Sequence, residues 1–506
     1  MKQAALGLGL LVMVLNVGLA RAADPPKRPV PDYDGRGGKR ETPARKALWV
    51  PRILLSPAYF VSEFLVRRPL GATVTAAEKA RVPRMLYDFF LFGRDHKAGI
   101  VPITLIDFGF EPSVGLYAFW DDAGFEGHEL RLHGSTWGSH WLSVTATERF
   151  HFSDRLDVTL TSTATRRPDY AFCGIGPDSR ETELMRYSAD TVDSRAQSNL
   201  SFAGSSLLQT SVGYRGASFG HSDYDEDNRG TVGYQPSVDD ALLGREPPGF
   251  VDGFRAPFAD ARLVLDSRER SSSETGVRFE ISAEEGVDLK NTPASGWLRY
   301  GGTVGGFWDV FDSSRVVSLS ISALMADPLG ERPVPFTQLV ALGGPRLMPG
   351  FRPGRLYDRS ATVATLRYSW PIWVWLDGSL QVATGNVFGA RFDGLRAGRG
   401  RLSTALGVES RGSRDSVFQA LVGFGTETFE SGANRFFARR SGGAKWLLGI
   451  EKPFSPSRCW GAPLPRASRC GPRSHVTSIR RRSRKRQKNT IRPSRGTAPT
   501  TWSSTP

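Results

Sequence analysis

Cysteine is scarce in this chain, and long apolar runs are missing from most of it. There are three cysteines in 506 residues, too few for a fold held together by a disulfide framework. Beyond residue 22 the longest uncharged apolar piece is Tyr368 to Leu376. This piece is about half as long as the ~20 residues that a membrane-spanning helix needs. We therefore expect no transmembrane helix in the body of the chain.

Motifs of catalysis are also missing. The chain holds no G-x-S-x-G turn, no Walker A loop and no C-x-x-C pair. His128 and His133 flank a segment that superficially looks like a zinc helix, but the spacing is not that of H-E-x-x-H. The segment alternates as a strand, which places the two histidines on opposite faces. Gly301 to Gly306 lies inside a strand pattern, which favours close strand packing over phosphate binding. We expect no enzymatic activity and no cofactor.

One acidic segment begins like a calcium loop, from Asp223 through Asp225 and Asp227. Its sixth position is Asn228 rather than glycine, and its twelfth is Tyr234 rather than glutamate. An exposed acidic loop is the preferred interpretation, and a loosely held Ca²⁺ that bridges lipid head groups is the alternative. We therefore expect no resident metal.

The first 22 residues predict an export signal. Lys2 supplies a positive charge, an apolar core follows from Ala4 to Leu19, and Ala20-Arg21-Ala22 fits the A-x-A cleavage rule. A membrane anchor is the alternative, but the apolar run is short of a full span. Residues 23–98 then read as a periplasmic lead-in, in which 47–92 carry capping signals of short amphipathic helices. A docking segment is favoured over a membrane-surface role there.

From about residue 100 to residue 454 the hydrophobic period is two. In one such segment Leu142, Val144 and Ala146 alternate with Ser143 and Thr145, as in a half-buried strand. Glycine, at 55 residues, and aromatics, at 11%, are abundant, and they favour one large β architecture. Soluble sandwiches and outer-membrane barrels share this pattern.

Three features favour the barrel. Small Ser, Thr and Gly dominate the polar faces, and aromatic residues gather at strand ends. The connections are unequal in length: short turns are expected at 312–314 and at Asp377-Gly378, and long loops at 166–186, 220–257 and 327–359. We expect an all-β fold over residues 99–454, a 16-stranded antiparallel transmembrane barrel in the cell outer membrane.

Residues 339–373 read LVALGGPRLMPGFRPGRLYDRSATVATLRYSWPIW. This segment resembles the inward-folded loop and following strand of the BamA/TamA family of outer-membrane barrels, which includes insertases and protein translocators. Other similarities follow in the family's order at 172–179 (FCGIGPDS), 265–269 (LDSRE) and 385–388 (GNVF). Five strand-like segments follow the loop, as the family's 16-stranded barrel requires. The resemblance covers roughly residues 95–430.

The resemblance also implies a site. An inward loop at 330–359 would carry its motif residues, and two positions of the barrel wall would face them. The loop residues are Met348, Pro349, Gly350, Phe351, Arg352, Arg355 and Asp358, and the wall positions are Arg367 and Ala383. Pro349 stands where the family has arginine, and Arg367 and Ala383 stand where acidic partners are common. The usual loop-to-wall ion pair is therefore expected to be absent; Arg346, Arg352 and Arg355 are near enough in sequence to substitute for it, together with Asp358. Residues 23–98 also leave little room for a periplasmic POTRA domain.

The positive charge of the chain, +15 in total, belongs to its ends. Residues 455–506 hold 13 Lys+Arg and no Asp or Glu. A frameshifted gene end, a solvated tail and a binding arm for anions are the three interpretations, in that order. Residues 23–454 hold 51 basic and 51 acidic side chains, so the body predicts no nucleic-acid partner.

Two hypotheses for function remain from the sequence. The first is a BamA/TamA-type barrel that assists insertion or translocation of envelope proteins, with unfolded outer-membrane or secreted proteins as clients. The second is a passive pore or structural barrel. In both, outer-membrane lipids and lipopolysaccharide surround the protein.

Overall fold

A computed structural model describes residues 64, 68, 89–93, 96–107, 109–202, 205–268, 275–291, 295–310, 315–344, 347–373, 376–410, 417–431 and 445–451. The leader expected at 1–22, nearly all of the helical segment expected at 47–92, Arg346, the turn at 312–314 and the tail at 455–506 lie outside these residues.

Strands dominate the described part of the chain. They are β1 (Leu91–Phe92), β2 (Ala98–Asp107), β3 (Ser113–Asp121), β4 (His128–Thr136), β5 (Leu142–His151), β6 (Leu156–Phe172), β7 (Met185–Ser201), β8 (Leu207–Gly220), β9 (Phe254–Asp266), β10 (Gly276–Asp288), β11 (Ser295–Asp309), β12 (Val316–Leu329), β13 (Val340–Leu342), β14 (Leu356–Asp358), β15 (Ser360–Trp373), β16 (Leu376–Phe388), β17 (Arg401–Ser410), β18 (Val417–Gly425) and β19 (Lys445–Glu451). Helical pieces are short: η2 (Glu181–Glu183), η3 (Glu226–Asn228), α6 (Val238–Ala241), η4 (Phe336–Gln338), η5 (Ala390–Phe392) and η6 (Ala397–Arg399). Among the described residues no helix has the length and apolar character to cross a bilayer.

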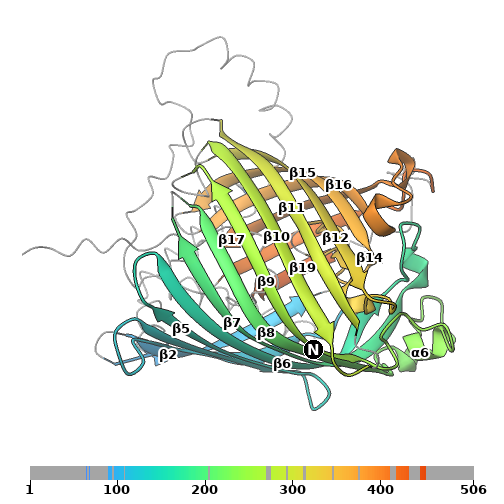
Figure 1. Ribbon diagram of the computed structural model, residues 1–506, viewed down its shortest axis with the longest axis horizontal. Coiled ribbons are helices and arrows are strands. Elements are labelled where there is room, and N and C mark those ends of the chain that lie inside the picture. Colours follow the sequence, from blue (N-terminus) through green and yellow to red (C-terminus); the bar gives the residue numbers. More distant parts are fainter. Residues whose placement is uncertain are drawn as a thin grey trace, which may run out of the picture. The chain divides into compact units, whose positions relative to one another are not determined.

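Each long strand pairs antiparallel with its neighbours in sequence, and the order returns to its beginning. The ladder runs from β2 through β12, passes to β15 and continues to β19, and β19 pairs with β2. Sixteen of the described strands take part in this ring of pairings, and the two-residue β1 adds to the edge of β2. In Figure 1 strands β9–β12 lie nearest the viewer, and β15–β17 lie behind them. The all-β, 16-stranded antiparallel prediction is confirmed.

The two faces of the sheet have the polarity expected of the barrel and not of the sandwich. On β5, Ser143 and Thr145 are buried at 1% and 5% exposure, whereas the alternating Val144 is 47% exposed. The same holds across the sheet, where apolar side chains are exposed at Leu116, Leu132, Leu160, Val212, Ile281, Val304, Ile321 and Leu366. The inner face carries charged networks instead, such as Arg215 with Asp193 and Glu284 at 2.8 and 3.0 Å. An apolar outside around a polar inside is the arrangement that a lipid environment selects.

Long connections gather at one end of the strands. The segments 173–184, 221–253, 330–359 and 389–400 follow strands that run in the same direction, and α6, β14 and these segments lie at the right of Figure 1. The first loop is shorter than the predicted 166–186, because β6 continues past an irregularity between Arg167 and Tyr170 and keeps pairing with β7 to Phe172.

One predicted turn is wrong. Asp377 and Gly378 lie inside β16, opposite Pro371 and Trp370 of β15. A Cβ at Gly378 would lie 2.3 Å from the indole of Trp370. The glycine therefore makes room for a cross-strand aromatic ring, a use of glycine within a sheet that local sequence does not distinguish from a turn signal.

Candidate functional site

The segment between β12 and β15 folds back as a small hairpin of its own. β13 pairs with β14 through Val340↔Asp358, Ala341↔Tyr357 and Leu342↔Leu356. Leu342, Met348 and Leu356 are buried at 0–1% exposure, so one face of the hairpin is packed, while Ala341 is exposed. Residues 330–359, the segment expected to form an inward loop, are called the inward loop below.

The tip of the inward loop lies directly on the backbone of β17 and β18. Gly350 N donates a hydrogen bond to Ser403 Oγ at 2.8 Å. A Cβ at Gly350 would lie 2.1 Å from Phe424 O, and one at Gly423 would lie 2.3 Å from Pro349 O. Two glycines that face each other's main chain therefore permit this contact, and any side chain at Gly350 would separate the loop from the sheet.

Apolar residues of the loop share one cluster with the wall. Met348 and Phe351 are 0% and 4% exposed and belong to a cluster that includes Ala383. Its remaining buried members are Ala326, Val340, Leu342, Leu356, Ala361, Val363 and Val387. Ala383, at 1% exposure, thus belongs to the same packed group as the loop motif. The wall position Arg367 does not take part: its guanidinium pairs with Glu409 at 2.6 Å.

The buried charge of the loop belongs to Arg355, whose side chain is 1% exposed. Its Nε donates to Glu181 Oε2 at 2.9 Å, and its Nη1 and Nη2 donate to Ser179 Oγ and Ser179 O at 2.9 and 2.8 Å. Glu427 Oε2 lies 3.4 Å from Nη2. Arg355 is therefore bound to two other connections at the same end of the strands, 173–184 and 426–430.

A second buried arginine completes this network. Arg401, at the start of β17, donates to Glu427 Oε2 at 2.6 Å and to the carbonyls of Pro177 and Ser179 at 2.9 and 2.6 Å. Asn386 donates to the same Pro177 carbonyl at 3.0 Å. Three segments singled out in the sequence, 172–179, 339–373 and 385–388, thus meet here, although sequence reasoning missed Glu181, Arg401 and Glu427.

Electrostatics in the network favour a charged Glu427. Burial raises the pKa of its carboxyl, but the hydrogen bond from Glu181 N and the guanidinium groups of Arg401 and Arg355 outweigh that effect, so the net pKa is lowered. The carboxylate is therefore the stable form at neutral pH.

Of the two remaining loop residues, Arg352 meets the network at Glu181, and Asp358 lies apart from it. The guanidinium of Arg352 lies against Gly109, and its Nε is 3.9 Å from Glu181 Oε1. Asp358, in β14, accepts a hydrogen bond from Arg359 N at 2.7 Å. No hydrogen bond or ion pair joins Asp358 to Arg355 within the described part of the chain, and burial raises the pKa of the Asp358 carboxyl.

Aromatic rings join the inward loop to the other long connections. Phe336, fully buried in η4, meets Phe172 and Tyr187 edge to face, with ring centroids 5.5 and 5.3 Å apart. Phe250 and Tyr357 lie 6.2 Å from the same ring. Connections 221–253 and 330–359 are therefore packed together with β6 and β7.

Comparison with known proteins yields structural similarity alone. No family model and no curated protein matches the chain. Among solved structures, a BamA from Haemophilus ducreyi that lacks POTRA domains 1–3 is similar with a TM-score of 0.44 at 12% identity, over 70% of this chain and 69% of that one. CdiB from Acinetobacter baumannii is similar with a TM-score of 0.41 at 11% identity, over 66% of this chain and 57% of that one.

Proposed function

We propose that this chain is an outer-membrane barrel of the BamA/TamA type that assists the insertion or translocation of envelope proteins. The observation that carries the proposal is the pairing between the first and last long strands. β19 meets β2 at Leu447↔Asp107, Leu448↔Ile106 and Gly449↔Leu105, three residue pairs. The neighbouring ladders β2–β3 and β18–β19 have eight and seven.

The edge of β2 is therefore only partly covered. β1 pairs with Ala98 and Gly99, and β19 pairs with 105–107. Between them, residues 100–104 have no ladder partner on this edge within the described ranges. An uncovered edge offers backbone groups to another extended chain, and strand addition is a general mode of peptide recognition. An unfolded client strand is the partner that such an edge fits.

The inward loop has a supporting role in this proposal. It packs on β17 and β18, next to β19. Its motif residues Phe351 and Met348 pack against the buried side chains of the sheet. Outer-membrane lipids and lipopolysaccharide would contact the exposed apolar face. The apolar outer face of the sheet supports the outer membrane as the location.

The pairing between β2 and β19, called the seam below, can be locked by a disulfide, and locking it tests the proposal. Leu105→Cys with Gly449→Cys places two thiols at paired positions of β2 and β19. Leu116→Cys with Gly134→Cys, a Leu–Gly pair across β3 and β4, is the matched control. Each variant is returned to a deletion strain, and the abundance of outer-membrane proteins is measured with and without reductant.

We expect the oxidised seam variant to fail to restore the abundance of outer-membrane proteins in the deletion strain, and to restore it after reduction. The control variant should restore it in both states. An outer-membrane proteome that does not change on deletion would contradict the proposal. So would a locked seam that complements fully.

A passive pore or structural barrel is the alternative. The packing of Phe336 against Phe172, Tyr187, Phe250 and Tyr357 favours a structural barrel over an open pore, because it fills space at the end where the long connections gather. Conductance in planar bilayers separates the two: a barrel filled in this way should conduct poorly, and large, steady currents would support a pore.

A further inference from the structure

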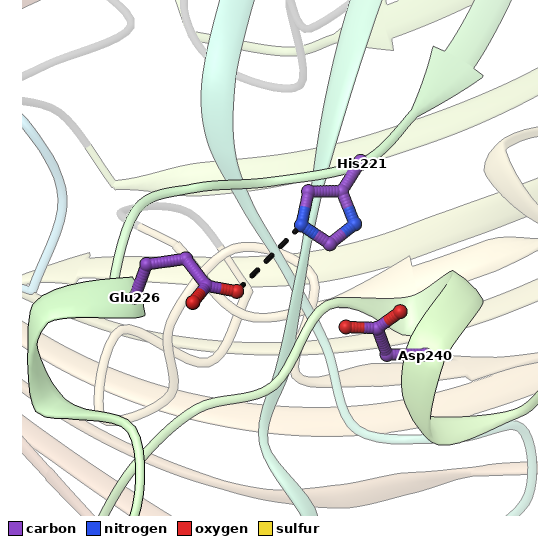
Figure 2. A group of neighbouring side chains, drawn as sticks. All are labelled: His221, Glu226 and Asp240. Carbon is purple, nitrogen blue, oxygen red and sulfur yellow. Dashed lines mark ion pairs between the residues drawn. The ribbon is translucent and has the colours of Figure 1, made fainter.

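The connection after β8 brings a histidine and two carboxylates together from three elements. His221 directly follows β8, Glu226 lies in η3, and Asp240 lies in α6. One nitrogen or oxygen of each lies within 4.8 Å of the others. Figure 2 shows the imidazole turned toward Glu226, with Asp240 nearby. The three side chains therefore converge on one space, although 19 positions separate the first from the last in the chain.

The imidazole is held in one orientation. Its Nδ1 lies 3.0 Å from Asp239 Oδ2, and Asp239 in turn accepts a hydrogen bond from the hydroxyl of Ser237. That hydroxyl also accepts a hydrogen bond from Ser222 N at 3.0 Å. A carboxylate on Nδ1 favours the tautomer in which Nε2 can bind a metal, and metal-binding histidines commonly have such a partner. Nε2 lies 3.8 Å from Glu226 Oε1.

The cluster carries more negative than positive charge. The carboxylates of Asp223, Glu226, Asp239 and Asp240 all lie near the imidazole or the guanidinium of Arg229. Arg229 Nη2 is 3.2 Å from an oxygen of both Glu226 and Asp240, and its side chain is 62% exposed. A largely exposed arginine therefore lies at the place where a small cation would neutralise the two carboxylates, and exposed ion pairs of this kind cost little to break.

The arrangement is not that of a calcium loop. Asp225, the third position of the pattern, accepts hydrogen bonds from Gln235 N and from Asn228 Nδ2, both at 2.7 Å. Its oxygens thus hold the turn together and do not join the cluster. One imidazole with carboxylate oxygens suits Zn²⁺ and related ions, whereas Ca²⁺ takes six to eight oxygens.

We propose that His221, Glu226 and Asp240 bind one divalent transition-metal ion, with Zn²⁺ as the typical occupant. Asp223 Oδ1 lies 3.4 Å from His221 Nε2 and is the fourth donor in reach. A bound ion would join the end of β8 to α6 and so fasten the beginning of the 221–253 connection. The site does not depend on the proposed insertion function, since no residue of the seam or the inward loop belongs to it.

Zinc binding to the full-length chain in detergent tests the site. Thiols are blocked first, because the chain has three cysteines. Equilibrium dialysis then measures Zn²⁺ binding, and Co²⁺ absorption reports the ligand geometry. We expect one ion per chain, and at least tenfold weaker binding in His221→Gln and in Asp240→Asn. Asp239→Asn should weaken binding about 10-fold through the orientation of the ring.

Two further variants make the test specific. Arg229→Gln removes the competing cation and should strengthen binding several-fold. His151→Gln is the matched control, because His151 Nε2 also pairs with a glutamate, Glu129, at 3.2 Å, but with arginines around it. It should leave binding unchanged. Heat-modifiable migration in gels verifies that each variant is folded.

The proposal is overturned if folded His221→Gln binds Zn²⁺ as the unaltered chain does. It is equally overturned if equimolar Ca²⁺ displaces Zn²⁺, because the carboxylates alone would then account for binding.

Discussion

Replacement of Arg355 by glutamine tests how the inward loop is held. In the folded chain the guanidinium is 1% exposed and donates to Ser179 and Glu181, with Glu427 nearby. Glutamine keeps some polarity but removes the charge and most donors. The carboxylate of Glu181 then loses its closest cation, while Glu427 keeps Arg401 at 2.6 Å.

The expected cost follows from the burial of the partners. Removal of one member of a buried ion pair costs about 3–5 kcal/mol. The side chains of Glu181 and Glu427 are 23% and 24% exposed, so water compensates them in part, and we expect about 3 kcal/mol, the lower end of that range. Arg367→Gln is the matched control. The side chains of Arg367 and its partner Glu409 are 36% and 34% exposed, so we expect this substitution to cost only about 0.2–1 kcal/mol.

Urea unfolding in lipid vesicles, followed by tryptophan fluorescence, measures both costs. A second variant examines the cause: Glu181→Gln should be less destabilising, by about 1 kcal/mol or more, when Arg355 is already glutamine, because the carboxylate that has lost its nearest guanidinium is then removed, although Arg352 Nε still lies 3.9 Å from it. Equal costs for Arg355→Gln and Arg367→Gln, within about 0.5 kcal/mol, would refute the assignment of Arg355 as the anchor of the loop.

Two further predictions concern other contacts between the inward loop and the β17–β18 region. Gly350→Ala should destabilise the chain by about 1–3 kcal/mol and expose the loop to protease, because its Cβ would meet the main chain of Phe424. Gly134→Ala is the control, because no atom lies within 4 Å of the new Cβ there. Equal effects of the two substitutions would contradict the close approach of the loop to β18. The pH dependence of stability should include Glu427, whose folded pKa is lowered. Its contribution is present above the ordinary value of 4.5 and is lost as the pH falls through the folded pKa. Urea midpoints at pH 7 and in acid should therefore differ less in Glu427→Gln than in the unaltered chain, and an identical difference would exclude this role.

Much of the fold could be predicted from period-two patterning, because each strand must place one face in lipid and one inside. The segment from Leu142 to His151 illustrates this: its serine and threonines are buried, and Leu142 and Val144 are exposed on the other face. The alternation of apolar and polar residues does not show where a strand ends when charged residues continue to pair across two strands. Arg166 pairs with Asp190 at 2.8 Å across β6 and β7, so charged residues that look like the start of a loop extend the ladder.

The site could be predicted only in part, because the residues that meet there are far apart in the sequence. The resemblance identified the loop motif, and Gly350 was among its residues. The partners of Arg355 lie 174 and 72 residues away, at Glu181 and Glu427. Local patterning gives no information on which carboxylate a buried arginine meets, because that depends on which connections gather at the same end of the sheet. The sequence pointed to the acidic residues from Asp223 onward but not to His221 or Asp240, because the fold of the 221–253 connection decides which of its side chains converge.

The anchoring of the inward loop also indicates which elements are held together. Glu427 lies just beyond β18, and it contacts both Arg355 of the loop and Arg401 of β17. Gly350 rests on the main chain of Phe424 in β18. The loop, β17 and β18 are therefore one mechanical unit, held by buried ion pairs and by a seven-pair ladder. The three pairs between β19 and β2 are the weaker contact. If the proposed seam opens, the loop should stay with β17 and β18 and with the 173–184 connection that Arg355 also contacts, since separating it would break these buried charges.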